Sequence, residues 1–68
     1  MNVKSLAAAN VEEYTDDFIY DRQRDSIFIR IEEQYTKIIK QRLFDLEYYL
    51  VLSEYDSEND EMILVFMR

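Results

Sequence analysis

The sequence contains no cysteine, histidine, glycine or proline among its 68 residues. Without cysteine, no disulfide bond or thiolate-bound metal can brace the fold. Without histidine and cysteine, the commonest general bases and the thiolate nucleophile of enzymes are missing. Without glycine, the usual phosphate-binding loop cannot form. These absences argue against catalysis and against a bound cofactor, and we expect neither an enzyme nor a cofactor-binding protein.

Long hydrophobic segments are also missing. The longest apolar run, residues 62–67, is far too short to span a bilayer. Residues 4–10, "KSLAAAN", carry one charge but no proper hydrophobic stretch, so we expect no signal peptide. We therefore expect a cytoplasmic protein without membrane contact, folded as one domain over residues 1–68. A domain this small buries a limited core, and a partner or a second copy could supply further burial.

The charge of the chain is strongly negative, with fifteen acidic and eight basic residues and a net charge of −7. The excess is uneven, because residues 1–21 carry −4, residues 22–42 carry +3 and residues 43–68 carry −6. Direct nucleic-acid binding is not expected, since phosphate contacts need a basic surface. An acidic surface confers solubility, and it also suits a basic partner, because complementary potentials steer association.

The first part of the chain has a helical pattern. With glycine and proline absent, turns must use asparagine, aspartate or serine. Asn10 and Glu13 form a capping-box pattern. The apolar residues that follow recur at helical spacing: Val11, Tyr14 and Phe18. The pattern predicts a first helix over about residues 10–21, which Ser5 and the alanines after it could extend backward.

The rest of the chain alternates between strand and helix patterns. Residues 26–31 are β-branched and aromatic and predict a strand. Apolar residues then recur with a period of 3.6, which predicts a helix over about residues 32–46. Residues 48–54 and 61–67 predict two further strands, joined by the turn "YDSEND". In that turn Asn59 is the residue expected at positive φ.

The order of these elements, α-β-α-β-β, predicts an α+β fold. The last two strands form a hairpin, and the helices should cover one face of a small sheet. We expect this sheet to be antiparallel, with a mixed sheet as the alternative. The first strand either pairs with the hairpin or lies at the sheet edge, and the pattern does not choose between them.

The acidic turn superficially resembles a calcium-binding loop that begins at Asp56. Such a loop needs glycine at its sixth position and a bidentate acid at its twelfth. Glu61 and Met67 stand at those positions. We therefore expect a solvated acidic turn and no metal site.

In the segment "RDSIFIRIEE", residues 24–33, acidic residues flank an apolar, strand-forming stretch on both sides. One interpretation is that the acids guard a half-buried strand against aggregation. The other interpretation is functional. Alternate residues of a strand lie about 6.6 Å apart, which is close to the spacing of successive phosphates on one DNA strand. Acids presented in this way can imitate nucleic acid and block the groove of a DNA-binding enzyme.

In the order of its motifs, the sequence resembles the phage-encoded uracil-DNA glycosylase inhibitors. The motif "DSI" at residues 25–27 is followed by the pair Glu32 and Glu33, an amphipathic helix, and then "LVLSEYDSENDEMILVF". The similarity covers roughly residues 10–67. Asp25 stands where the family usually has glutamate, so its carboxylate reaches about one methylene less. Longer members of the family continue into two more strands.

The resemblance implies a DNA-mimicking inhibitor of a bacterial uracil-DNA glycosylase, acting in the cytoplasm of a phage host. The acid-Ser-Ile strand would enter the enzyme's DNA-binding groove. An apolar cavity between helix and sheet would take up the hydrophobic side chain that the enzyme normally pushes into the DNA stack. The expected partner-binding residues are Asp25, Ser26, Ile27, Phe28, Glu32, Glu33, Ile38, Ile39, Leu43, Leu52, Tyr55, Asp56 and Ile63.

The wall of that cavity is assigned from apolar periodicity, and ordinary core packing is the alternative for the same residues. The wall candidates are Ile38, Ile39, Leu43, Leu50, Leu52, Ile63 and Val65. Two other functions also stay open. The chain could be a small acidic phage or mobile-element protein that binds another host DNA-processing protein, or a structural homodimer whose acids only confer solubility.

Overall fold

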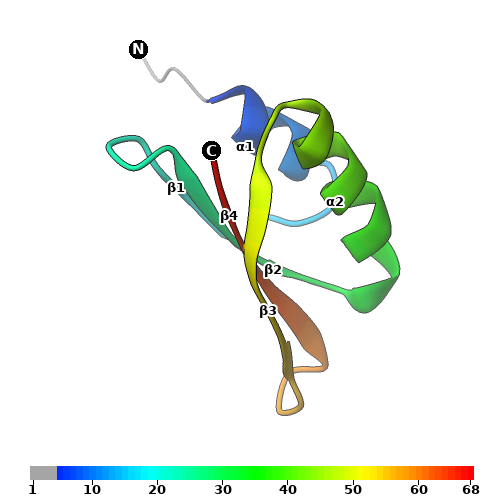
Figure 1. Ribbon diagram of the computed structural model, residues 1–68. Helices are drawn as coiled ribbons and strands as arrows, with labels where there is room; N and C mark the ends of the chain where they lie inside the picture. The colour runs from blue at the N-terminus through cyan, green and yellow to red at the C-terminus, as the bar shows by residue number, and fades with distance from the viewer. Residues whose placement is uncertain (1–4) are drawn as a thin grey trace.

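The computed structural model describes residues 5–68, which fold as a helical layer on a four-stranded antiparallel sheet (Figure 1). The elements are α1 (Leu6–Val11), β1 (Phe18–Asp21), β2 (Ser26–Ile31), the 3-10 helix η1 (Glu33–Tyr35), α2 (Thr36–Asp45), β3 (Tyr49–Asp56) and β4 (Glu61–Met67). The predicted α+β class is confirmed. The strands predicted at residues 26–31 and 61–67 coincide with β2 and β4.

The strand order of the sheet is β1-β2-β4-β3, and every neighbouring pair is antiparallel. The first predicted strand, β2, therefore pairs with the C-terminal hairpin through β4. It also pairs with β1 on its other side, which makes β2 a central strand. The edges of the sheet are β1 and β3. None of the helices in residues 5–68 is long and apolar enough to cross a membrane.

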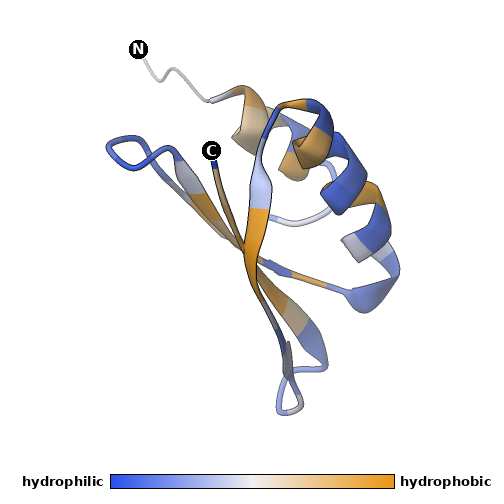
Figure 2. Cartoon of the chain, viewed as in Figure 1, coloured by the Kyte–Doolittle hydropathy of each residue, from blue (hydrophilic) through white to orange (hydrophobic). Residues whose placement is uncertain are grey.

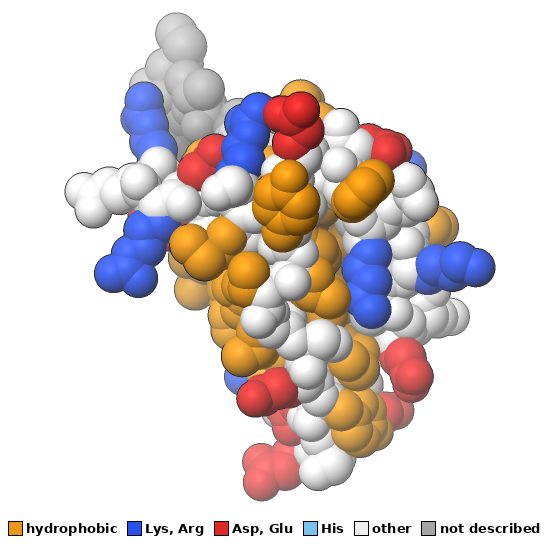
Figure 3. Space-filling view, viewed as in Figure 1, with side chains coloured by type: hydrophobic (Ala, Val, Ile, Leu, Met, Phe, Trp, Pro, Cys, Tyr) orange, Lys and Arg blue, Asp and Glu red, His pale blue; other side chains and the backbone are white. Residues whose placement is uncertain are grey.

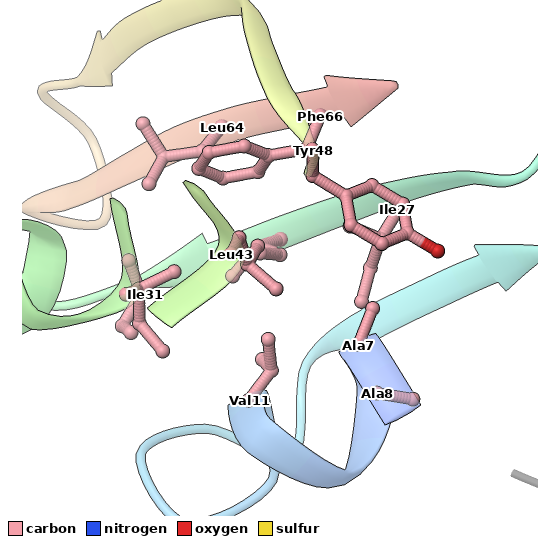
Figure 4. Packing of buried hydrophobic residues seen from close by; sticks show 11 residues of the cluster. Ala7, Ala8, Val11, Ile27, Ile31, Leu43, Tyr48, Leu64 and Phe66 are labelled. Carbon is pink, nitrogen blue, oxygen red and sulfur yellow. The ribbon is translucent and has the colours of Figure 1, made fainter. Parts of the chain in front are cut away.

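The core lies between the helices and one face of the sheet (Figure 4). Burial alternates along β2, where Ile27, Ile29 and Ile31 are buried and the residues between them are half-buried. Two of these isoleucines pair with Phe66 and Leu64 of β4, which are also fully buried. Each such side chain stabilises the fold by about 1.5–3 kcal/mol when it leaves water. The remaining core residues are Ala7, Ala8, Val11, Ile39, Leu43 and Tyr48.

The prediction of a helix over residues 10–21 is wrong for most of that range. The helix ends at Val11, and residues 18–21 form β1. Its N-cap is Ser5, whose hydroxyl accepts a 3.0 Å hydrogen bond from the Ala8 N–H, so the capping box expected at Asn10 does not form. The Thr15 hydroxyl donates to the Arg30 carbonyl at 2.7 Å and ties the connecting segment to β2. Pairing with β2 thus overrides the local helical spacing.

The turns use aspartate and glutamate where glycine is absent. Among residues 5–68, those at positive φ are Asp25, Glu47 and Asp60, with φ of 49°, 69° and 52°. The prediction that Asn59 takes this role was wrong by one position. In the β1–β2 turn, Asp21 Oδ1 accepts hydrogen bonds from the N–H groups of Gln23 and Arg24, at 3.0 and 3.3 Å. These side-chain hydrogen bonds stabilise the β1–β2 turn without a glycine, which is why the sequence did not predict this hairpin.

Candidate functional site

Acidic side chains gather at one end of the molecule, where β2 leads into η1 and where β3 turns into β4. In Figure 3 several acidic side chains appear toward the lower end, which holds the β3–β4 turn in Figure 1. We call this set the acidic end, and it consists of Glu32, Glu33, Glu58, Asp60 and Glu61. The fold thus brings together two acidic segments that are well separated along the chain.

A groove of about 440 Å³ lies within the acidic end. It is lined by charged and amide residues: Glu32, Glu33, Gln34, Asn59, Asp60 and Glu61. A groove with four carboxylates in its wall favours an incoming lysine or arginine side chain, which can donate to those oxygens. Within residues 5–68, no group of three or more His, Cys, Asp or Glu side chains is arranged to hold a metal ion.

The β3–β4 turn is held in shape by Asp56. Its carboxylate accepts hydrogen bonds from the Asn59 side chain at 2.8 Å, from Arg30 Nη1 at 2.9 Å and from the Glu58 N–H at 3.1 Å. The Asn59 and Arg30 bonds hold the pKa of Asp56 below its ordinary value. Asp56 is therefore an ionised group that is already paired, and the unpaired charge of this end lies on its neighbours.

Tyr55 adds a second brace to the same turn. Its hydroxyl donates a hydrogen bond to Asp60 Oδ1, and this bond raises the pKa of the Tyr55 phenol. The bond holds the positive-φ residue of the turn against the edge strand. Both Tyr55 and Asp56, expected as partner contacts, thus shape the acidic end.

The strand expected to enter a partner's groove lies in the middle of the sheet. Hydrogen-bonded neighbours flank β2 on both sides, so its backbone is not available to another chain. Ile27 is fully buried against the helices, opposite Phe66. Its assignment as a partner contact is wrong in this structure, because a side chain in the core cannot reach a partner. Ser26 and Phe28 point to the other face of the sheet and are half-buried.

Asp25, the first residue of the acid-Ser-Ile motif, is engaged by three neighbours. Its Oδ1 accepts hydrogen bonds from the Tyr48 hydroxyl and, at 2.9 Å, from the Tyr20 hydroxyl. Its Oδ2 lies 3.6 Å from Arg68 Nη1. The Tyr48 bond, followed by the Tyr20 bond, lowers the pKa of Asp25, while burial chiefly raises that of Tyr48. Asp25 thus ties the β1–β2 turn to the start of β3.

This cluster makes stability dependent on pH at both extremes. The folded-state pKa of Asp25 lies below its ordinary 3.8, so its contribution is present above that pH and is lost as the pH falls below it. The folded-state pKa of Tyr48 lies above its ordinary 10.0, so its contribution is present below pH 10.0 and is lost as the pH rises further. We expect Tyr48→Phe to flatten both limbs of the curve of unfolding free energy against pH. Urea titrations across the pH range would measure this, and unchanged limbs would contradict it.

The residues predicted to wall an apolar cavity do not share one space. Ile39 and Leu43 are fully buried in the core, while Ile38 is exposed on α2. The register of β3 and β4 places Leu52, Ile63 and Val65 on the sheet face opposite the helices. The prediction of one shared cavity is therefore wrong for all seven residues: Ile38, Ile39, Leu43, Leu50, Leu52, Ile63 and Val65. The sheet itself separates one part of the set from the other.

Ile39 offers a direct test of this correction. In a filled core, Ile39→Phe overpacks and costs roughly 1–3 kcal/mol of unfolding free energy. In an open pocket the added ring would fill space and leave stability nearly unchanged. We expect the former, because the Ile39 side chain is fully buried. Denaturant unfolding of the purified variant measures the difference. A variant as stable as the wild type would instead support an open pocket at Ile39.

The acidic end combines predicted and unpredicted residues. Glu32 and Glu33 were predicted from the sequence and line the groove. Gln34 and the lining residues of the turn were missed, although the charge of −6 over residues 43–68 pointed to that region. A further signal lay in the alternation of acids at every second position: Glu54, Asp56, Glu58 and Asp60.

No protein-family model, curated protein or solved structure matches this chain. The likeness to the glycosylase inhibitors therefore rests on the short motifs of the sequence alone.

Proposed function

We propose that this protein is a DNA-mimicking inhibitor that occupies the DNA-binding groove of a bacterial uracil-DNA glycosylase. The observation that carries the proposal is the acidic end, in which Glu32 and Glu33 meet the β3–β4 turn around one groove. These are the two acidic motifs that follow the acid-Ser-Ile segment in the family that the sequence resembles. Such a target implies the cytoplasm of a bacterial phage host.

The spacing of the acids supports mimicry of a nucleic-acid backbone. Glu54 and Asp56 project from the same face of the edge strand β3, about 6.6 Å apart along the strand. Beyond them the turn supplies Glu58 and Asp60. A DNA-binding groove holds lysine and arginine side chains that contact phosphates. Asp56 is already paired with Arg30, so Glu54, Glu58 and Asp60 are the carboxylates that can take the place of those phosphates.

In this proposal the mode of binding differs from the insertion of a strand. Ile27 is buried and β2 is central, so the acid-Ser-Ile segment supports the fold. The acidic end then makes the contact with the enzyme. Electrostatic attraction would steer this protein toward a basic groove before contact, because the chain has a net charge of −7 and four of its carboxylates line the acidic groove.

A uracil-excision assay tests the proposal. A fixed amount of bacterial uracil-DNA glycosylase is mixed with increasing amounts of this protein, and uracil release from a labelled duplex is followed. We expect release to fall in proportion to the added protein until the two are equimolar. Full release at a large excess of the protein would end the proposal for this enzyme.

A second candidate function is the binding of another DNA-processing protein of the host. The central position of β2 favours it, because the strand contact implied by the glycosylase inhibitors is not available. The same acidic end would then face a different basic groove, such as that of a nuclease or polymerase subunit. Retention of such a protein from lysate on the wild-type chain, together with undisturbed uracil excision, would favour this candidate.

A further inference from the structure

The sheet face opposite the helices is apolar across all four strands. The register places one residue of each strand in a single transverse row: Ile19, Phe28, Val65 and Leu52. Tyr49 and Ile63 point to the same side. We call these six residues the open face. No element within residues 5–68 covers it, and Ile19 and Tyr49 expose 67% and 64% of their surface. Apolar residues thus form a continuous patch.

The polar groups on this side are arranged as they are in an interface. The central strands carry two charged side chains here: Arg30, which already pairs with Asp56 at 2.9 Å, and Glu61, which begins β4 and belongs to the acidic end. Because the Asp56 carboxylate also accepts bonds from the turn, covering this pair leaves no lone charge. The unpaired acid Glu54 lies on the edge strand β3, and Asp21 lies on the opposite edge. An apolar centre within a polar rim is typical of protein interfaces.

The size of the open face suits a partner with a similar surface. Four strands at about 4.8 Å spacing, with an average length of about 20 Å, cover a flat footprint on the order of 400 Å². This footprint is about half of the roughly 800 Å² that each partner gives to a standard interface, so we expect a small interface and a dimer in equilibrium with the monomer.

The charges at the two ends of the sheet differ. The β1–β2 turn and the end of β4 carry Arg22, Arg24 and Arg68, and basic side chains appear at the upper left in Figure 3. Arg24 pairs with Asp21 at 3.8 Å, and Arg68 pairs with Asp25 at 3.6 Å and with Glu47 at 3.8 Å. Among the described residues at this end, Arg22 is the arginine that makes no ion pair. The opposite end is the acidic end. A copy turned end over end would lay each acidic end toward the β1–β2 turn of the other copy, so dimerisation and binding of an enzyme at the acidic end compete.

We propose that a second copy of this chain packs on the open face, with its strands running in the opposite direction. The two-fold axis lies between the sheets and crosses the strands, so the interface is isologous. The transverse rows of the two copies meet near the centre, as inner faces do in a sandwich with sheets about 10 Å apart. The helices lie outside, and the dimer has four layers. A parallel arrangement would instead bring the two acidic ends together.

Sedimentation equilibrium of the wild-type chain and two variants at about 0.15 M salt tests the surface. We expect a monomer–dimer equilibrium for the wild type. Ile19→Lys places a charge in the apolar row and should weaken dimerisation roughly tenfold or more. Phe44→Lys is the matched control, because Phe44 lies on α2 with 66% of its surface exposed, against 67% for Ile19. It should dimerise like the wild type.

Circular dichroism of both variants checks that the fold is kept. A wild type that stays monomeric over the whole concentration range overturns the proposal. A dimer that Ile19→Lys leaves intact also overturns it, and would point to pairing through the β3 edge or the helices. If Ile19→Lys were unfolded, Leu52→Lys, at the other end of the row, provides the same comparison with Phe44→Lys.

Fluorescence energy transfer tests the orientation, since the chain has no cysteine of its own and extends 35 Å along its longest axis. Donor and acceptor dyes are attached to Ser57→Cys in the acidic turn or to Arg24→Cys in the β1–β2 turn. The antiparallel dimer predicts stronger transfer between labels on Ser57→Cys and Arg24→Cys chains than between two Ser57→Cys chains. The reverse order would overturn the arrangement proposed here.

Discussion

Reversing the charge of Glu32 and Glu33 together should weaken binding to uracil-DNA glycosylase by about 100-fold or more, which corresponds to ~3 kcal/mol. Both residues line the acidic groove, where they would face the lysine and arginine side chains of the enzyme. Each substitution to lysine removes an attraction and adds a repulsion. Titration calorimetry or the inhibition constant in the excision assay measures the effect.

Asp45→Lys with Glu47→Lys is the matched control for this pair. It changes the net charge by the same amount, but Asp45 is the last residue of α2 and Glu47 follows the helix, so both lie away from η1. We expect this variant to lose only the small, general part of the attraction. If the two double variants bound equally weakly, the total charge would account for binding and the acidic groove would have no special role.

Ile27→Ala should lower the free energy of unfolding by about 2–5 kcal/mol, the usual cost of truncating a buried isoleucine. The side chain is fully buried between the sheet and the helices, opposite Phe66. In a domain of this size the whole stability is of the same order, so a large fraction of the variant would be unfolded at ambient temperature. Denaturant unfolding of the free protein gives the value directly.

Ile19→Ala is the comparison for this loss, since Ile19 is an isoleucine on the neighbouring strand with most of its surface exposed. Its effect on a monomer should stay within about 0.5 kcal/mol. Had Ile27 been a partner contact, Ile27→Ala would leave the free protein stable and weaken the complex. Equal, small losses for both variants would therefore contradict the placement of Ile27 in the core.

The sequence predicted the elements whose pattern and burial agree. β2 and β4 were found at their observed bounds because β-branched and aromatic residues dominate them, and α2 was found from its apolar stripe. β1 was missed because it is only four residues long and its residues also fit a helical spacing. Its identity depends on pairing with β2, which is a contact between segments and leaves no local pattern.

The acidic end was predicted in part for a similar reason. Glu32 and Glu33 stood out as a pair, but their meeting with Asp60 and Glu61 depends on the strand order. The motif at Asp25 suggested an exposed contact, whereas the fold uses its carboxylate to join two tyrosine hydroxyls and an arginine. A linear motif does not reveal that Asp25 lies in a turn or that Ile27 lies in the core.

Competition between this protein and DNA for the glycosylase tests the central claim most directly. Labelled protein is bound to the enzyme, and an uncleavable duplex that contains a uracil analogue is added in increasing amounts. If the acidic end occupies the DNA-binding groove, the duplex and the protein exclude each other, and the apparent affinity of the protein falls in proportion to the duplex concentration. A ternary complex, in which the enzyme holds both at undiminished affinity, would contradict the account.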